Sequence, residues 1–179
     1  MATWNSRGLR GSLLEDMINQ TNEKYRSEHL ALIQKIPTPI TPVRMDKASH
    51  QITLAYFDQR STVDYIGAVQ GIPVCFDAKE CKTGNFPIQN IHEHQIVFMQ
   101  DFEDQGGIAF LVIYFSEAGR FFYLPYGKLV YFWNRSKTGH QKHFSIEELD
   151  PAYEIRCNGF LLSYLEQLQL DILSRPEPG

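Results

Sequence analysis

The stretch that decides the fold is Ser61–Lys82, with the sequence STVDYIGAVQGIPVCFDAKECK. Two extended segments flank an expected turn at residues 70–71, and pairing them as a hairpin would bring Asp64 close to Asp77 and Lys79. Because side chains alternate along a strand, Asp77 and Lys79 project from the same face. Two carboxylates for a hard cation, with a lysine for developing negative charge, suit a site that cleaves phosphodiesters. The stretch therefore predicts a nuclease.

The short pattern of an acid two residues before a lysine also has a second interpretation. Asp77 and Lys79 can form a solvated ion pair on an exposed strand face, and for the bare pattern this is the more common case. The preceding run Ile72–Phe76 is too apolar for an ordinary surface edge. Functional sites in α/β proteins gather at the ends of such strands, so the context favours the functional interpretation.

Length and composition indicate a single globular domain over residues 1–179. The chain is 43% hydrophobic and 13% aromatic, which is enough for a well-buried core. No apolar run approaches the ~20 residues of a membrane span, so no membrane association is expected, and the N-terminus lacks the apolar segment of a signal peptide. Three cysteines without a CxxC pair indicate reduced thiols in a cytoplasmic protein.

The net charge of −4 argues against a simple non-specific DNA binder, which is usually basic. The charge is uneven along the chain. Residues 1–60 carry eight Lys or Arg and six Asp or Glu, whereas residues 61–179 carry nine and fifteen. Because several of the later acids would bind metal or lie far from a substrate, the charge weakens a nucleic-acid function without excluding it.

The order of the expected elements predicts a mixed α/β domain. Capping-box spacing, with an acid three residues after the cap, marks helix starts after Ser12 and at Asn90. The run Ile108–Phe115 is almost entirely apolar, which is typical of a strand covered on both faces. Helices are expected at residues 13–26, 90–104 and 160–173, with a helical turn at 145–148. Further strands are expected at residues 30–36, 54–57, 120–123 and 128–133.

Three prolines interrupt this order after the first strand. The run PTPITP at residues 37–42 forbids a helix and disfavours a central strand. Residues 37–53, which also carry Arg44 and Lys47, are therefore expected to leave the core. We expect the chain to re-enter the sheet near Leu54–Phe57.

Polar residues in the helix expected at 90–104 each allow more than one interpretation. Gln95 falls within the apolar stripe of this helix, and a buried amide needs partners. From spacing alone, a core hydrogen bond is favoured over a role as an oxygen ligand to a metal. His92 and His94 are two residues apart and are expected to project from different helix faces, unlike the i, i+4 pair of a zinc protease.

Three motifs stand in order along the middle of the chain: S-T-x-D-Y-x-G at 61–67, F-D-A-K-E at 76–80 and N-F-P-I-Q-N-I-H-E-H-Q at 85–95. Together they resemble the RecU family of Holliday-junction resolvases, which belongs to the restriction-endonuclease-like PD-(D/E)xK nucleases. Ser6-Arg7-Gly8 resembles the family's N-terminus, Leu129–Trp133 resembles part of its C-terminal half, and Pro37-Thr38-Pro39 resembles the segment that precedes its protruding stalk. The resemblance covers nearly the whole chain.

The resemblance implies a fold and an activity. The implied fold is α/β and restriction-endonuclease-like, a mixed central sheet flanked by helices, with a short protruding stalk over residues 37–53. The implied enzyme is a Mg²⁺-dependent endonuclease, with Mn²⁺ as a substitute. As a homodimer it would resolve four-way (Holliday) DNA junctions by symmetric paired nicks in recombination and repair, alongside other recombination proteins.

The resemblance also implies roles for single residues. Thr62, Asp64, Asp77 and Gln95 fall where the family binds magnesium, and Lys79 falls where its lysine stabilises the transition state. This reverses the preference for Gln95, from core amide to metal ligand. The chain departs from the family at Asp77, where the family has Glu, and its stalk segment is shorter. The residues expected to bind DNA are Arg7, Arg44, Lys47 and Lys82.

Alternatives to junction resolution stay open at this point. A nuclease of the same fold could act on duplex or flap DNA. A junction-binding recombination accessory could cleave weakly, given Asp77 and the short stalk. The chain has no recognisable base-reading motif, which favours recognition of branched shape over recognition of sequence.

Overall fold

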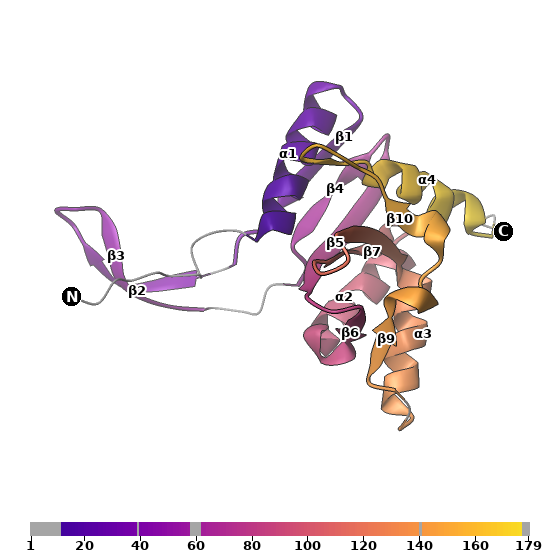
Figure 1. Cartoon of the computed structure of the whole chain (residues 1–179). Coiled ribbons are helices and arrows are strands. Elements are labelled where there is room, and N and C mark those ends of the chain that lie inside the picture. The colour runs from indigo at the N-terminus through magenta and orange to yellow at the C-terminus, as the bar shows by residue number, and fades with distance from the viewer. Residues whose placement is uncertain (1–11, 39, 58–61, 140, 177–179) are drawn as a thin grey trace.

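The structure, a computed structural model, describes residues 12–38, 40–57, 62–139 and 141–176, and six strands among these residues form a central sheet (Figure 1). Of the described neighbouring pairs in the sheet, only β5 and β7 run parallel. The expected mixed sheet is confirmed. In sheet order, the strands are β1 (Ala31–Lys35), β4 (Tyr65–Val69), β5 (Ile72–Cys81), β7 (Ile108–Phe115), β8 (Arg120–Pro125) and β10 (Glu154–Ile155).

The predicted hairpin is the β4–β5 pair. Val69 pairs with Ile72 across the tight turn, and Tyr65 pairs with Phe76 at the other end. Gln70 and Gly71 both have positive φ, 49° and 87°, which a two-residue turn between twisted strands requires. Glycine adopts this conformation without steric cost. The turn therefore fixes the register that places residues 64 and 77 next to each other.

Helices cover both faces of the sheet, as Figure 1 shows. On one face, alternate β7 residues such as Leu111 pack with α2 (Glu93–Asp104) and α3 (Tyr126–Lys137). On the other, Phe110 and Val112 pack with α1 (Leu13–Ser27) and α4 (Tyr164–Ser174). The strand expected to be covered on both faces is therefore confirmed. None of the helices in the described residues is long and apolar enough to span a bilayer.

A hairpin of β2 (Ile40–Asp46) and β3 (Gln51–Phe57) projects away from the sheet and its helices (Figure 1). The prediction that residues 54–57 re-enter the sheet is wrong, because they pair with β2; the sheet resumes at β4. Pro42 lies in β2 next to a register shift. This position tolerates proline because a strand paired on one side has backbone N–H groups without ladder partners.

The segment predicted as a strand at residues 128–133 is helical and belongs to α3. Tyr126, Leu129 and Phe132 recur every three residues and are buried on one side of the helix. The prediction failed because aromatic residues favour strands, whereas here the three-residue period of burial determines the structure. Packing against β7 and β8 stabilises the helix.

Two helix starts also differ from the prediction. Residues Ile88–Asn90 form a single 3₁₀ turn, η1, and α2 begins at Glu93 with His92 as its N-cap. The last helix begins at Tyr164, because residues before it form a small hairpin. The remaining elements are β6 (Asn85–Pro87), β9 (His143–Ser145), η2 (Ile146–Glu148), η3 (Pro151–Tyr153), β11 (Cys157–Asn158) and β12 (Leu161–Leu162).

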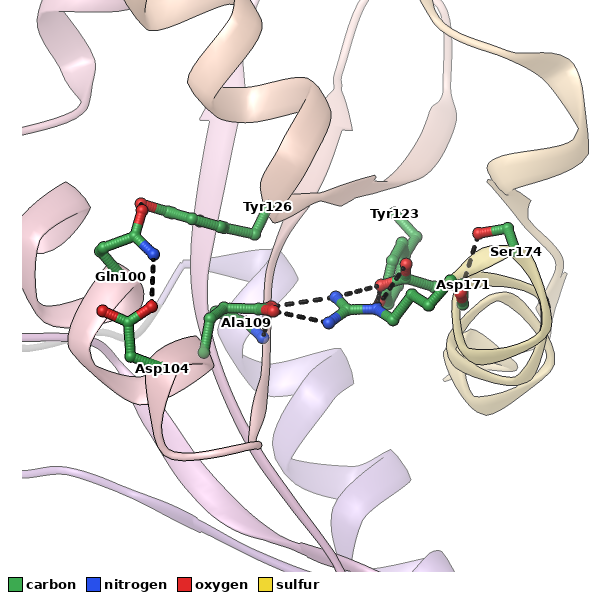
Figure 2. Close-up of polar contacts among 9 residues, drawn as sticks. Gln100, Asp104, Ala109, Tyr123, Tyr126, Asp171 and Ser174 are labelled. Carbon is green, nitrogen blue, oxygen red and sulfur yellow. Dashed lines mark hydrogen bonds and ion pairs between the residues drawn. The ribbon is translucent and has the colours of Figure 1, made fainter. Parts of the chain in front are cut away.

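A polar cluster joins the C-terminal ends of α2 and α4 across the sheet. Arg175 binds Glu103 (Nη1 to Oε2, 2.5 Å) and Asp171 (Nε to Oδ1, 3.1 Å). Tyr123 donates its hydroxyl to Asp171, as Figure 2 shows, and the backbone N–H of Ala109 donates to Glu103. Asp171 is 3% exposed, so its charge depends on these partners. The cluster holds α2 against the sheet from the end opposite His92.

Removal of the Arg175 guanidinium should destabilise the fold strongly. Arg175→Met leaves the buried Asp171 carboxylate without its cation, and we expect the free energy of unfolding to fall by about 3 kcal/mol. The control Arg156→Met breaks an exposed pair with Glu166, so it should change stability by less than about 1 kcal/mol. Urea unfolding followed by circular dichroism measures both. Equal effects of the two substitutions would contradict a structural role for the cluster.

Candidate active site

The β4–β5 hairpin brings Asp64, immediately before the start of β4, next to Asp77 of β5. The backbone N–H of Asp64 donates to Asp77 Oδ1 at 2.9 Å. In return, the backbone N–H of Ala78 donates to Asp64 Oδ2 at 2.9 Å. Each carboxylate is thus held by the backbone of the opposite strand, and the two acids lie side by side as the sequence predicted.

Lys79 lies on the same face of β5 as Asp77, as the alternation of the strand predicted. Its Nζ is 2.5 Å from Asp77 Oδ2. The Asp77 side chain is 0% exposed and that of Lys79 is 18% exposed. This largely buried pair excludes the alternative of a solvated ion pair on a strand surface, because buried charges persist only with close partners.

Gln95 reaches Asp77 from the first turn of α2. Its Nε2 donates to Asp77 Oδ2 at 2.7 Å. Its Oε1 accepts from the backbone N–H of His92 at 3.1 Å and lies 3.4 Å from Lys79 Nζ. The same amide therefore caps the helix through its oxygen and binds the buried acid through its NH2 group, which is the hydrogen-bonding role expected from spacing alone, and its role as a metal ligand stays a prediction.

The electrostatics of the site favour binding of a cation. Burial, and then the negative charge of Asp77, raise the pKa of Asp64 to about 6, against the opposing hydrogen bond from Ala78. Lys79 supplies one positive charge to two carboxylates that lie beside each other. The ionised site therefore carries excess negative charge, which a divalent cation would neutralise.

The donor atoms suit a hard cation. Carboxylate oxygens of Asp64 and Asp77 and the amide oxygen of Gln95 are the ligand types that Mg²⁺ prefers, and magnesium sites often use only one or two carboxylates. Thr62 lies partly buried two residues before Asp64, outside the hydrogen bonds described above. The described residues contain no group of three or more His, Cys, Asp or Glu side chains placed to hold a metal.

The candidate DNA-binding residues lie apart from one another. Arg44 is exposed in β2, and Lys47 is exposed in the turn of the same hairpin. Lys82 is exposed immediately after β5, at the end that carries Lys79. Arg7 lies outside the described residues. The structure thus places Lys82 directly after β5, and Arg44 and Lys47 on the separate β2–β3 hairpin.

The prediction that His92 and His94 project from different helix faces is wrong. His92 is the N-cap of α2, so it precedes the helix, and the two rings stack at 5.4 Å between centroids. The capping role of His92 was missed at the level of sequence. The signal was its spacing to Gln95, since a polar cap with Gln three residues later has the spacing of a capping box.

Comparison with known proteins shows similarity to one family, both in a family model and in individual relatives. The family model "RecU: Recombination protein U" matches residues 9–170. The Holliday junction resolvase RecU of Oenococcus oeni is 43% identical over 139 residues, which cover 75% of this chain and 71% of that protein. The Holliday junction resolvase RecU of Bacillus pumilus is 42% identical over 155 residues, which cover 84% and 75%.

Among solved structures, the Holliday junction resolvase Hjc of Archaeoglobus fulgidus matches with a TM-score of 0.38 and 9% sequence identity. The match covers 63% of this chain and 69% of that chain.

The raised pKa of Asp64 predicts a pH-dependent loss of stability in metal-free protein. The folded state keeps this proton to a pKa of about 6, whereas the unfolded chain releases it near 3.8. Between these values the folded state binds more protons, so the contribution of Asp64 to the free energy of unfolding falls as pH rises from about 4 to about 6. Asp64→Asn removes this contribution.

Urea unfolding in EDTA between pH 4 and pH 7 measures the effect as a difference between wild type and Asp64→Asn. We expect the variant's stability relative to wild type to increase over this range. Addition of Mg²⁺ at pH 7 should then raise the unfolding midpoint of wild type more than that of the variant. Parallel pH curves for the two proteins would contradict the raised pKa.

Proposed function

The chain belongs to the RecU family, and from this premise we propose that it is a Mg²⁺-dependent endonuclease that resolves four-way (Holliday) DNA junctions by symmetric paired nicks. The family match spans residues 9–170, which include every member of the candidate site. The observation that carries the proposal is the convergence of Asp64, Asp77, Lys79 and Gln95 through direct contacts. We place the reaction in DNA recombination and repair.

The residues divide the proposed chemistry between them. Asp64 and Asp77 would hold the cation, with Gln95 and Thr62 as neutral oxygen donors. A divalent cation bound there supplies Lewis-acid polarisation of the phosphate and makes hydroxide available at neutral pH. Lys79 provides a fixed positive charge beside this position and stabilises the charge that develops on the phosphate during cleavage. Asp64 acts in its ionised form.

Gln95 contributes orientation in addition to its oxygen. Its Nε2 hydrogen bond fixes the Asp77 carboxylate, and its position depends on the start of α2 at Glu93. Asp77 is shorter than the Glu found in the family, yet it reaches Asp64, Lys79 and Gln95 at once. This geometry supports an active site built around aspartate at this position.

Paired nicks require two copies of the site. The described residues of a chain hold one such cluster, so we propose a homodimer whose two-fold axis coincides with that of the junction. Recognition would follow the branched shape of the DNA, through the phosphate backbone. The three cysteines, all within the described residues, are free, and we place the enzyme in the reducing cytoplasm.

Cleavage of a synthetic four-way junction with Mg²⁺, beside a linear duplex of matched sequence, tests the proposed function. We expect symmetric nicks in the junction and little cutting of the duplex. Asp64→Ala should lower the cleavage rate by about 10³-fold or more, because several kcal/mol of transition-state stabilisation is lost with the cation. Junction binding by this variant should persist. The control Glu28→Gln changes an exposed acid on α1's end and should cleave normally.

Each other outcome of this assay identifies a different function. Equal cutting of the linear duplex would indicate a duplex or flap nuclease of the same fold. Tight junction binding without cutting would indicate a recombination accessory. Full activity of Asp64→Ala would refute the assignment of the site.

Mixed dimers test the proposed stoichiometry. A dimer that combines one wild-type subunit with one Asp64→Ala subunit should nick a single strand of each junction, because each subunit serves one strand. Denaturing gels of doubly end-labelled junctions measure the ratio of single to paired nicks. Paired nicks at the wild-type ratio would show that one subunit can cut both strands.

A further inference from the structure

An ion pair between α2 and α3 lies beside the candidate site and takes no part in the chemistry proposed above. Lys137 Nζ lies 2.8 Å from Glu93 Oε1. Glu93 opens α2, two residues before Gln95, and Lys137 ends α3. The two helices lie on the same face of the sheet (Figure 1). Lys137 and Glu93 are 44 residues apart, so sequence patterns give no sign of the contact.

The pair is connected to the candidate site through the first turn of α2. Glu93 and Gln95 belong to the same turn of α2, with Gln95 buried towards Asp77 and Glu93 exposed on the other side. The ammonium of Lys137 is therefore separated from the site by about one helix diameter, roughly 10–12 Å. A DNA strand carries one charge per ~3.4 Å of helix axis, so a strand cleaved at Asp77 has further phosphates within this distance.

Neighbouring groups hold the Lys137 ammonium at the surface. It lies over the ring of Trp133 at 4.9 Å, and Trp133 packs against the core. Its position in the last turn of α3 places it where the helix dipole favours a cation. The Lys137 side chain nevertheless remains 53% exposed and accessible to a ligand. The Lys137 ammonium is thus held in a defined position while it remains exposed to solvent.

Glu93 is suited to give way to a stronger anion. Its side chain is 72% exposed, and Lys137 Nζ lies 2.8 Å from its carboxylate, so solvent and other anions can reach both partners. An exposed ion pair of this kind contributes little to stability. Replacement of the carboxylate by a DNA phosphate therefore costs little, because the phosphate provides an equivalent partner and releases counterions.

We propose that Lys137 binds a backbone phosphate of the DNA strand near the scissile phosphate, and that Glu93 occupies Lys137 in the free protein. This inference rests on the proposed function in requiring DNA as the substrate. It adds a contact on α3 to the hairpin and strand residues expected to bind DNA. Glu93 thereby becomes a competitor that weakens binding.

The salt dependence of binding to a four-way junction tests this contact. Affinity is measured by fluorescence anisotropy in EDTA, to prevent cleavage, between 50 and 200 mM salt. Lys137→Met should weaken binding about three- to tenfold and should reduce the slope of log K against log salt by about 0.9, the loss of one phosphate contact. Lys137→Arg should keep both values, and Glu93→Gln should strengthen binding severalfold.

Lys24→Met is the matched control, because Lys24 also pairs with a glutamate on an exposed helix surface, Glu28 at 3.7 Å. It should leave affinity and slope at wild-type values. An unchanged slope in Lys137→Met, or an equal loss in Lys24→Met, would overturn the contact. Should Lys137→Met fail to fold, an unchanged affinity in Glu93→Gln would overturn it instead. If the protein binds and cuts linear duplex as well as it does the junction, junction resolution is refuted but the Lys137 contact is not. The contact would then be tested by the change that Lys137→Met makes in the salt slope of duplex binding.

Discussion

The buried carboxylate of Asp77 is the constraint on which the site and much of the fold depend. Its side chain is fully buried, so its charge must be balanced by nearby groups. Those groups come from separate elements: the backbone of Asp64 before β4, Lys79 on β5 and Gln95 on α2. The hairpin register and the start of α2 must therefore both be correct before this carboxylate can be buried.

The adjacent carboxylates of Asp64 and Asp77, which suit cation binding, destabilise the folded state of the metal-free protein. Two carboxylates held side by side repel each other, and the raised pKa of Asp64 records that cost together with burial. Contacts elsewhere hold the structure together. The β5–β7 pairing carries both hydrophobic clusters, and Arg175 holds the far end of α2 through Glu103. The rest of the fold thus keeps α2 in place, so that Gln95 stays hydrogen-bonded to Asp77 although Asp64 and Asp77 repel each other.

The net charge of −4 does not describe the charge that a DNA substrate would meet at the candidate site. Four of the fifteen acids in residues 61–179 pair with three arginines: Glu103 and Asp171 with Arg175, Glu148 with Arg135, and Glu154 with Arg120. These acids add little to the field at the candidate site. The local charge at that site depends on Asp64 and Asp77 together with the nearby Lys79 and Lys82, and net charge alone does not report this distribution.

The sequence by itself determined the β4–β5 hairpin, the doubly covered β7, the first helix and the pairing of Asp64 with Asp77 and Lys79. These features follow from the alternation of strand side chains and from a two-residue turn, which are local properties. Tertiary structure decided that residues 128–133 form a helix, that α2 starts at Glu93, and that Lys137 reaches Glu93. Each of these depends on which surfaces pack together, because an aromatic-rich segment fits a strand or a helix until its neighbours are fixed.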